Sequence, residues 1–487
     1  MKKTLLLLFA LLLGLSLIGC KRDNRIVVRF VLPSGQIADA IKNLKFEEDF
    51  ENENPDINVI ITGVSGSYDD VKKQTILDIN SGSKSAPDLV LGYPDHFAEY
   101  YGGGALVNMQ PYIDNPEYGF TEDELADFIP SYLAENRGFI NNESQDLFGL
   151  PFNKSSEVLI YNKTAMVALY GEEEYLNKVP STWAELETLT ADIMAKVTNG
   201  DLDNIWEEEA DDPDTEEIDP KYLSISRYVT ENKFRPFGYD ASDNAFITLL
   251  HQWGLPYTSR DNVSKGYYEF DTDGTRAMLE ELVRLNTAKV FNLAPHFGSN
   301  YCSDALKQIR CLLTVGSTAG VRYNESSKYE YELGVAPIPY KEADKKFVIQ
   351  QGTNIAMLDV NSTEEELIAA WKFVKFMLTP ERAAKFAMET GGYFPVRASS
   401  FNSDEYQEYL ENPTDDKRAY SQAATVAFTS YNVDYTYFVD PAFLGSSEIR
   451  DEVEILLEDI LVNASDVDAS MRNTINKLFP YKKAAAN

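Results

Sequence analysis

Residues 25–32 read RIVVRFVL, a short run rich in β-branched side chains that predicts a β-strand. Two similar runs follow, INVIIT at 57–62 and DLVL at 88–91. Between the three runs, apolar residues recur at helical spacing over 37–50 and 68–79. Strand alternating with helix is the pattern of a parallel or mixed sheet that helices cover. The sequence therefore predicts an α/β fold that starts at this stretch.

The same pattern indicates where a ligand would bind. Ligands of such sheets lie beyond the carboxyl ends of the strands, so the loops 63–68 and 92–96 are expected to form walls of a site. The helical pattern returns later in the chain, at 182–197, 275–285, 364–378, 380–390 and 447–462.

Length and charge bound the possible functions. A chain of 487 residues exceeds what one hydrophobic core usually organises, which predicts two lobes or domains. The net charge of −34 repels nucleic acid and anionic lipid, so neither is expected as a partner.

The first twenty residues have the composition of a secretory signal. Lys2 and Lys3 precede an apolar run at 5–13, which is shorter than the roughly 20 residues that span a bilayer. The quartet LIGC that ends at Cys20 resembles the lipobox of bacterial lipoproteins. This resemblance implies a signal peptide at 1–19, lipidation of Cys20 and a mature chain tethered outside the cytoplasmic membrane. It does not say which membrane carries the anchor.

Two further cysteines and one acidic stretch leave alternatives open. Cys302 and Cys311 are an even pair in an exported protein, which favours one disulfide, although two reduced buried cysteines remain the alternative. The acidic stretch 201–219 lacks the residue order of a calcium loop and contains no glycine, so a solvated surface insertion is expected.

Motifs of catalysis are absent. The chain has no phosphate loop and no dinucleotide fingerprint, and its three histidines lie far apart without an H-E-x-x-H motif. The segment GVSGS at 63–67 has its second glycine one position too early for a nucleophile elbow. A glycosidase with two carboxylates remains formally open. We therefore expect no catalytic residue, no metal and no cofactor.

Several blocks, taken in order, resemble the extracellular solute-binding proteins of ABC importers, and above all those for sugars and glycerol-3-phosphate, which are relatives of maltose-binding protein. The blocks are PDLV at 87–90 with GALV at 104–107, FGLPFN at 148–153 with LIYNK at 159–163, PSTWAEL at 180–186, GVAPIP at 334–339, and AWKF at 370–373 with TGGYFPV at 390–396.

This resemblance implies a two-lobed type II periplasmic-binding-protein fold, with discontinuous α/β lobes joined by a hinge and a ligand in the cleft between them. The chain would cross between the lobes near 153–157, 351–354 and 429–440. The N-terminal lobe would comprise 20–153 and 354–430, and the C-terminal lobe 154–353 and 431–487.

The matched motifs also imply ligand contacts. Asp95 stands next to Pro94, which occupies the position of the subgroup's acid. The implied ligand-binding residues are Tyr68, Asp95, Ser155, Ser156, Ser317, Gly352 and Tyr393. Hydroxyls, backbone amides and ring faces of this kind suit a polyhydroxy ligand. Trp183 is expected to pack, while Trp206 and Trp253 are further candidates for stacking on a sugar.

The resemblance predicts a lipid-anchored, monomeric receptor that captures a mono- or oligosaccharide and delivers it to an ABC permease. Where the subgroup carries an arginine for phosphate, residues 439–444 read VDPAFL, and the nearest arginine is Arg450 in a predicted helix. This departure favours a neutral sugar over a phosphate ester. The alternatives are a receptor for glycerol-3-phosphate or a glycerophosphodiester, a surface carbohydrate-active hydrolase, and a surface adhesin.

Overall fold

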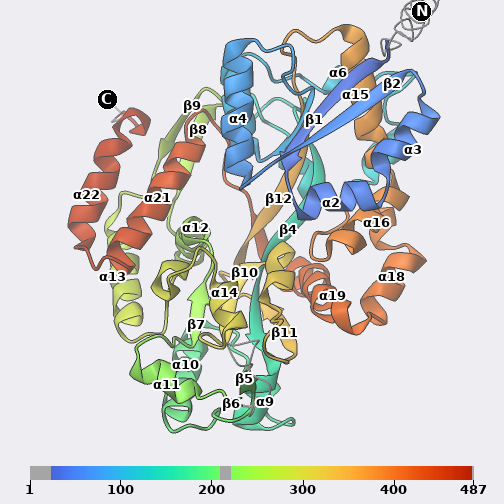
Figure 1. Ribbon diagram of the computed structural model, residues 1–487. Coiled ribbons are helices and arrows are strands. Elements are labelled where there is room, and N and C mark those ends of the chain that lie inside the picture. Colours follow the sequence, from blue (N-terminus) through green and yellow to red (C-terminus); the bar gives the residue numbers. More distant parts are fainter. Residues whose placement is uncertain (1–23, 209–220, 485–487) are drawn as a thin grey trace, which may run out of the picture.

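The computed structural model describes residues 24–208 and 221–484. The predicted signal peptide, Cys20 and most of the acidic stretch 201–219 lie outside the described residues. A long sheet runs through two lobes, each of which carries helices on its faces (Figure 1). Among the described helices, none is both long and apolar enough to cross a membrane.

The strands of the main sheet follow the order β2-β1-β3-β12-β4-β10-β7, with β11 paired to β4 and β13 to β12. Their bounds are β1 (Ile26–Pro33), β2 (Ile57–Val64), β3 (Leu89–Gly92), β4 (Leu150–Asn162), β7 (Phe237–Tyr239), β10 (Leu313–Ser317), β11 (Leu333–Pro337), β12 (Phe347–Met357) and β13 (Thr436–Phe438). Two separate hairpins pair β5 (Glu207–Glu208) with β6 (Lys221–Tyr222), and β8 (Thr258–Asn262) with β9 (Lys265–Tyr268). The three strands predicted at the N-terminus are confirmed, and β1 lies parallel to both β2 and β3.

Helices cover the sheet in each lobe, and further short helices lie in the stretch of chain between α16 and α21. Those of the first lobe are α2 (Gln36–Asn43), α3 (Phe46–Glu53), α4 (Tyr68–Ser81), α5 (Pro94–Gly102), α6 (Gln110–Ile113), α7 (Glu122–Ala126), α8 (Pro130–Ala134), α15 (Glu364–Met377) and α16 (Pro380–Thr390). Those of the second lobe are α9 (Lys163–Tyr170), α10 (Trp183–Thr198), α11 (Ile225–Thr230), α12 (Ser242–Trp253), α13 (Asp273–Thr287), α14 (Cys302–Lys307), α21 (Ser446–Leu461) and α22 (Val467–Lys477). Between α16 and α21 lie α17 (Ala398–Phe401), α18 (Asp404–Glu411), α19 (Arg418–Thr425) and α20 (Asn432–Asp434). Short 3-10 or π turns are η1 (Tyr175–Lys178), η2 (Ala294–Phe297), η3 (Thr318–Asn324), η4 (Asp415–Lys417), η5 (Val426–Tyr431) and η6 (Phe479–Tyr481).

Local sequence signals explain most of the helix boundaries. Ser67, Thr182 and Thr363 each cap a helix with a capping box, in which the third helical residue binds back to the cap. The helix predicted over 37–50 is instead two helices, because the chain turns at Lys45, whose φ of 56° is left-handed. The other helices that the pattern predicts are confirmed to within a few residues.

Strands β4 and β12 connect the two lobes (Figure 1). β12 pairs with β3 in the first lobe and with residues 150–156 of β4, and the later part of β4 pairs with β10 and β11 in the second lobe. The predicted crossings near 153–157 and 351–354 therefore lie side by side in one antiparallel pair. Gly352 has a φ of 86°, and a Cβ at this position would collide with the backbone of Asn153 and Lys154, so the hinge needs glycine here.

Each lobe has its own apolar core. One cluster joins β1, β2 and β3 to α15 and α16, and a second joins the early strands and helices of the second lobe to α21 and α22. The division of the chain into lobes stays a prediction, and the cores bear on its last boundary. Buried side chains of residues 419–427 pack into the core of the second lobe, although the sequence assigns them to the first.

Cys302 and Cys311 are both buried and both free. Burial raises the pKa of the Cys311 thiol to about 12. The structure therefore has the second of the two alternatives, a pair of reduced cysteines that pack as small apolar side chains.

Candidate ligand cleft

A cavity of about 310 Å³ lies between the lobes, beside the hinge strands. The first lobe contributes the start of α4 and the start of α5, and the second contributes α12, α21, the start of β8 and the loop 439–442. The volume is within the range of small-molecule sites, which are clefts of roughly 300–1,000 Å³. The loops 63–68 and 92–96, which the strand pattern predicted as site walls, both supply lining residues.

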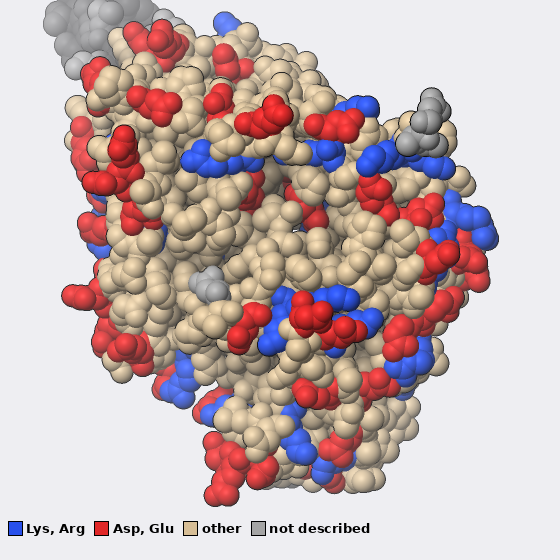
Figure 2. Space-filling model, turned by 180° about the vertical axis from the view of Figure 1, so that it is seen from behind, with Lys and Arg blue, Asp and Glu red and all other residues tan. Residues whose placement is uncertain are grey.

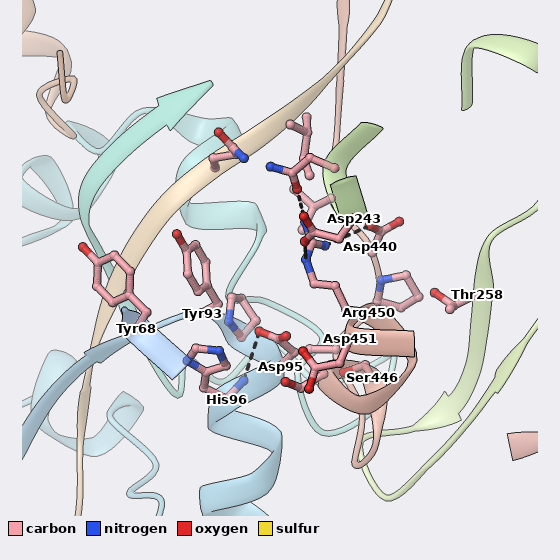
Figure 3. A pocket seen from close by; sticks show the side chains of 18 of the residues that line it. Tyr68, Tyr93, Asp95, His96, Asp243, Thr258, Asp440, Ser446, Arg450 and Asp451 are labelled. Atoms are coloured by element: carbon pink, nitrogen blue, oxygen red, sulfur yellow. Dashed lines mark hydrogen bonds and ion pairs between the residues drawn. The ribbon is translucent and has the colours of Figure 1, made fainter. Parts of the chain in front are cut away.

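Aromatic rings form the wall of the first lobe. The rings of Tyr68 and Tyr93 lie 5.3 Å apart at 72°, and those of Tyr93 and His96 lie 5.4 Å apart at 90°. Tyr68 is the first residue of α4, and Tyr93 caps α5, so both rings stand at helix starts beyond the sheet. Figure 3 shows the two tyrosine rings next to one another at the cavity. Such edge-to-face packing leaves ring faces free to stack on a ligand.

Arg450 reaches into the cavity from the second lobe (Figure 3). Its Nε lies 2.6 Å from Asp243 Oδ2, and its Nη1 lies 3.9 Å from Asp440 Oδ2. Burial opposes its charge, but the carboxylates around it raise the pKa of Arg450 above its ordinary value. Arg450 lies in α21, as the sequence predicted, and its guanidinium lines the cavity although residues 439–444 carry no arginine. The first turns of α21 border the cleft, and the long side chain spans the remaining distance.

Carboxylates on the two lobes differ in their surroundings. Asp69 accepts from His96 Nε2 at 3.3 Å and from Lys72 Nζ at 2.8 Å, and these contacts hold the pKa of Asp69 well below its ordinary value. Across the cavity, burial and neighbouring negative charges raise the pKa of Glu454 to about 7 and also raise that of Asp451. The second lobe thus presents negative charge that nearby cations do not balance.

Several residues that line the cavity have a buried polar atom without a hydrogen-bond partner within the described residues. These atoms are the hydroxyl of Tyr257, Thr258 Oγ1, Gln351 Oε1, Asp440 Oδ2 and His96 Nδ1. Tyr257 is only 5% exposed. Leaving a buried polar group unpaired costs about 1–3 kcal/mol, and most such groups in proteins find a partner. A polar ligand in the cavity would supply these partners.

The predicted site residues fall into three groups. Tyr68 and Asp95 line the cavity. Ser155, Ser156 and Gly352 lie in the paired hinge strands, where Ser156 Oγ donates to Ile349 O at 2.8 Å. Their positions in the hinge suit a structural role, and the structure does not bring them to the cavity wall.

The remaining two predicted residues lie elsewhere along the lobe interface. Ser317 caps η3 by accepting from Ala319 N at 3.2 Å. Tyr393 is half-buried and its hydroxyl interacts with that of Tyr68, but Tyr393 itself does not line the cavity. Its neighbour Gly392 packs against the backbone of Thr318 in the second lobe, and a Cβ there would collide with it.

The tryptophans do not reach the cavity. Trp183 packs beside Tyr239 and donates from Nε1 to Gln252 at 2.7 Å, as expected of a packing residue. Trp206 is buried and donates to the backbone carbonyl of Glu330. The ammonium group of Lys341 lies over the ring of Trp253.

Sequence reasoning missed Tyr93, Asp243, Tyr257 and Asp440. Tyr93 lies inside the loop 92–96, so the strand pattern already marked its position. Asp440 lies at the end of the predicted third crossing. Asp243 and Tyr257 have no comparable signal, since only the packing of α12 and β8 brings them to the cavity.

Comparison with known proteins adds a family and a fold. Residues 45–414 match the family described as bacterial extracellular solute-binding protein. The sn-glycerol-3-phosphate-binding periplasmic protein of Escherichia coli K12 is 23% identical over 419 residues, which are 83% of this chain and 82% of that protein.

Two solved structures show the same fold at low identity. The glycerophosphocholine complex of UgpB from Mycobacterium tuberculosis has a TM-score of 0.69 at 17% identity and covers 94% of this chain and 98% of that one. The maltose-bound protein MalE3 of T. maritima has a TM-score of 0.65 at 17% identity and covers 93% of this chain and 99% of that one. The predicted two-lobed α/β fold is thereby confirmed.

Proposed function

We propose, from the premise that this chain belongs to the bacterial extracellular solute-binding protein family, that it captures a carbohydrate between its lobes and delivers it to the permease of an ABC importer. The observation that carries the proposal is the cleft itself. Two tyrosine rings line one lobe, other lining residues have buried polar atoms that no described residue satisfies, and the cavity has the volume of a small saccharide.

The chemistry of the walls suits a polyhydroxy ligand. Tyr68 and Tyr93 offer ring faces to the apolar C–H face of a sugar. Asp440 Oδ2 and Gln351 Oε1 are acceptors, and the hydroxyl of Tyr257 can donate or accept. A sugar hydroxyl is both donor and acceptor, so one ligand can satisfy groups on both lobes at once.

Capture would work by closure of the lobes. The lobes already touch at the rim of the cleft, where Lys72 Nζ donates to Ser447 Oγ and Gly445 N donates to Glu99 Oε1 at 3.1 Å. A ligand that contacts both walls binds the closed state better than the open one, and therefore shifts the population toward it. The permease would then recognise the closed shape.

A phosphate ester is the second candidate, because Arg450 lines the cleft and a relative of this chain is named for glycerol-3-phosphate. However, Asp243 already engages the guanidinium, and Asp440 stands next to it. A phosphate would have to displace a carboxylate at 2.6 Å and enter a cavity lined by further acids. Burying it there would carry a large desolvation and repulsion cost, so a carbohydrate remains our proposal.

The anchoring of the receptor rests on its N-terminus. We propose that Cys20 carries a lipid that holds the chain outside the cytoplasmic membrane as a monomer, with no chemical step in the cleft. Replacement by Cys20→Ala is expected to abolish incorporation of labelled palmitate, because the thiol is the acceptor of the acyl chains. Equal labelling of the variant and the parent would contradict the anchor and leave the cleft proposal standing.

Thermal unfolding with a ligand panel tests the function. The panel holds mono- and disaccharides with and without amines, and glycerol-3-phosphate at the same concentration. A ligand at a hundredfold excess over its Kd stabilises the native state by about 2.7 kcal/mol, which raises the Tm. We expect at least one carbohydrate to raise the Tm of the parent. The same carbohydrate should raise the Tm of Tyr93→Ala by less. The exposed control Tyr222→Ala should show the same rise as the parent. A shift with glycerol-3-phosphate and with none of the sugars would overturn the proposal.

A further inference from the structure

Acidic side chains dominate the cleft. Its lining includes a single arginine and seven carboxylates, which are Asp69, Asp95, Glu135, Asp243, Asp440, Asp451 and Glu454. Acidic residues also spread over both lobes on the face shown in Figure 2, in keeping with the net charge of −34. Three of the seven have a close cationic partner: Asp69 pairs with Lys72 at 2.8 Å, Glu135 with Lys154 at 2.6 Å and Asp243 with Arg450 at 2.6 Å.

The other four carboxylates lack such a partner. Within the described residues, Asp95, Asp451 and Glu454 form no ion pair. Asp440 has only the ring of His251 at 3.3 Å on one oxygen, and the guanidinium of Arg450 at 3.9 Å on the other. Burial, and then the negative charges of its neighbours, raise the pKa of Glu454 to about 7, so a cation next to it would favour its ionised form. Carboxylates on an exposed surface are solvated by water. Carboxylates in a cavity between two closing lobes lose part of that water and therefore need another partner.

Unpartnered groups of another kind point to an organic ligand. Tyr257 is 5% exposed, lines the same cavity and has no partner for its hydroxyl in the described part of the chain. The described residues contain no group of three or more acidic, histidine or cysteine side chains placed to hold a metal ion. Single carboxylates spread over two walls, together with tyrosine rings, suit a positive charge carried by a larger molecule.

We propose that the cleft selects a carbohydrate that carries a protonated amine, held between the tyrosine wall and two carboxylates, Asp440, whose Oδ2 has no hydrogen-bond partner in the described residues, and Glu454, which forms no ion pair there. This inference rests on the proposed function and adds the charge of its ligand. An ammonium group donates three hydrogen bonds and would supply Asp440 Oδ2 with the partner it lacks. The ring faces of Tyr68 and Tyr93 attract a cation as well as a sugar face.

Three disaccharides with the same β-1,4-linked backbone provide the test: chitobiose with two amines, cellobiose with hydroxyls in their place, and N,N′-diacetylchitobiose with neutral amides. Calorimetry near pH 7.5 ionises most of Glu454, whose pKa is about 7. It also leaves more than half of the amines protonated if their pKa is like that of an α-amino group, about 7.7–8.0. We expect chitobiose to bind at least about tenfold more tightly than both neutral sugars. We expect this advantage to persist largely at high salt, because charges buried between the lobes are screened much less than exposed ones.

Variants separate the charge from the fold. Glu454→Gln and Asp440→Asn are expected to lower the ratio of chitobiose affinity to cellobiose affinity several-fold, because each removes a negative charge at almost constant shape. Asp123→Asn removes an exposed charge on α7, away from the cleft, and should leave the ratio at its parental value. The side chain of Glu454 is partnered by no hydrogen bond in the described structure, so this variant should fold like the parent.

The outcomes distinguish the inference from the proposed function. Binding of cellobiose or diacetylchitobiose as tight as that of chitobiose overturns the amine inference and leaves the carbohydrate receptor standing. An unchanged ratio in both Glu454→Gln and Asp440→Asn also overturns it. Failure of every saccharide in this set and in the thermal panel overturns the proposed function and the inference together.

Discussion

The hinge and the cleft lie next to one another, and both bury polar side chains, but they treat them in opposite ways. In the hinge, Lys154 is fully buried and contacts Glu135 Oε2 at 2.6 Å and the carbonyl of Gly352 at 3.0 Å. Gln350 and Asn354 donate to the same glutamate at 2.6 and 3.0 Å. In the cleft, Tyr257 and Asp440 keep buried atoms that no described residue satisfies.

The contrast between hydrogen-bonded polar groups in the hinge and unsatisfied ones in the cleft indicates which region holds the structure and which binds a ligand. Satisfied networks fix one geometry, which a hinge needs because it must return to the same closed state. Unsatisfied polar groups lower the stability of the free protein, and they are expected at a site where a bound ligand supplies the missing hydrogen-bond partners. The hinge network is therefore assigned to structure and the cleft to recognition.

The hinge should show the largest effect on stability. Lys154→Ala leaves Glu135 as a buried charge without its main partner, and breaking a buried pair in this way costs about 3–5 kcal/mol. Urea unfolding measures the loss. The control Lys163→Ala removes a partly exposed lysine that pairs with Glu332 at 2.8 Å and should cost at most about 1 kcal/mol. Equal losses of unfolding free energy in Lys154→Ala and Lys163→Ala would contradict the structural role assigned to the hinge network.

A second hinge prediction concerns pH. Burial raises the pKa of Glu157 to about 8, although Tyr239 donates to it at 2.6 Å. In the unfolded chain this acid ionises near 4.5, so the folded state holds an extra proton between about pH 4.5 and 8. The free energy of unfolding must therefore fall as pH rises through that window, by up to about 1.4 kcal/mol per pH unit from this group.

Glu157→Gln should remove this contribution. We expect the variant's free energy of unfolding to fall less steeply with pH over the same window, as measured by urea unfolding at several pH values. Parallel curves for the variant and the parent would show that Glu157 does not stay protonated in the folded hinge.

The cleft should show its effect in binding and not in folding. Tyr93→Ala removes a ring from the aromatic wall and should weaken carbohydrate binding by about 1–3 kcal/mol, the range for a central aromatic anchor. Calorimetry measures this loss, and urea unfolding should show a much smaller change than in Lys154→Ala. An unchanged affinity would remove the aromatic wall from the site.

The sequence predicted the fold better than the site. Alternating strands and helices and the ordered family blocks are local signals, and the structure follows them closely. Side chains of the cleft come from elements far apart in the chain, and no local pattern says which of them converge. Tyr68 and Asp95 could be predicted because they lie in loops that follow predicted strands, and ligands of such sheets bind beyond the carboxyl ends of the strands.

Arg450 shows the limit of reasoning by alignment to a motif. The absence of arginine from 439–444 is correct, but a helix that starts a few residues later delivers one from a different backbone position. The serines of the matched blocks show the converse. Ser155 and Ser156 match by sequence, and their strand directs them into the hinge. Position in a motif does not determine which wall a side chain faces.

The most direct test of the account is a crystal structure of the chain with the saccharide that gives the largest thermal shift. The account predicts that the ligand lies against the rings of Tyr68 and Tyr93, with a hydrogen bond to the hydroxyl of Tyr257 and contacts from both lobes. A ligand bound instead in the separate opening lined by Gln36, Arg322 and Lys417 would contradict the assignment of the cleft.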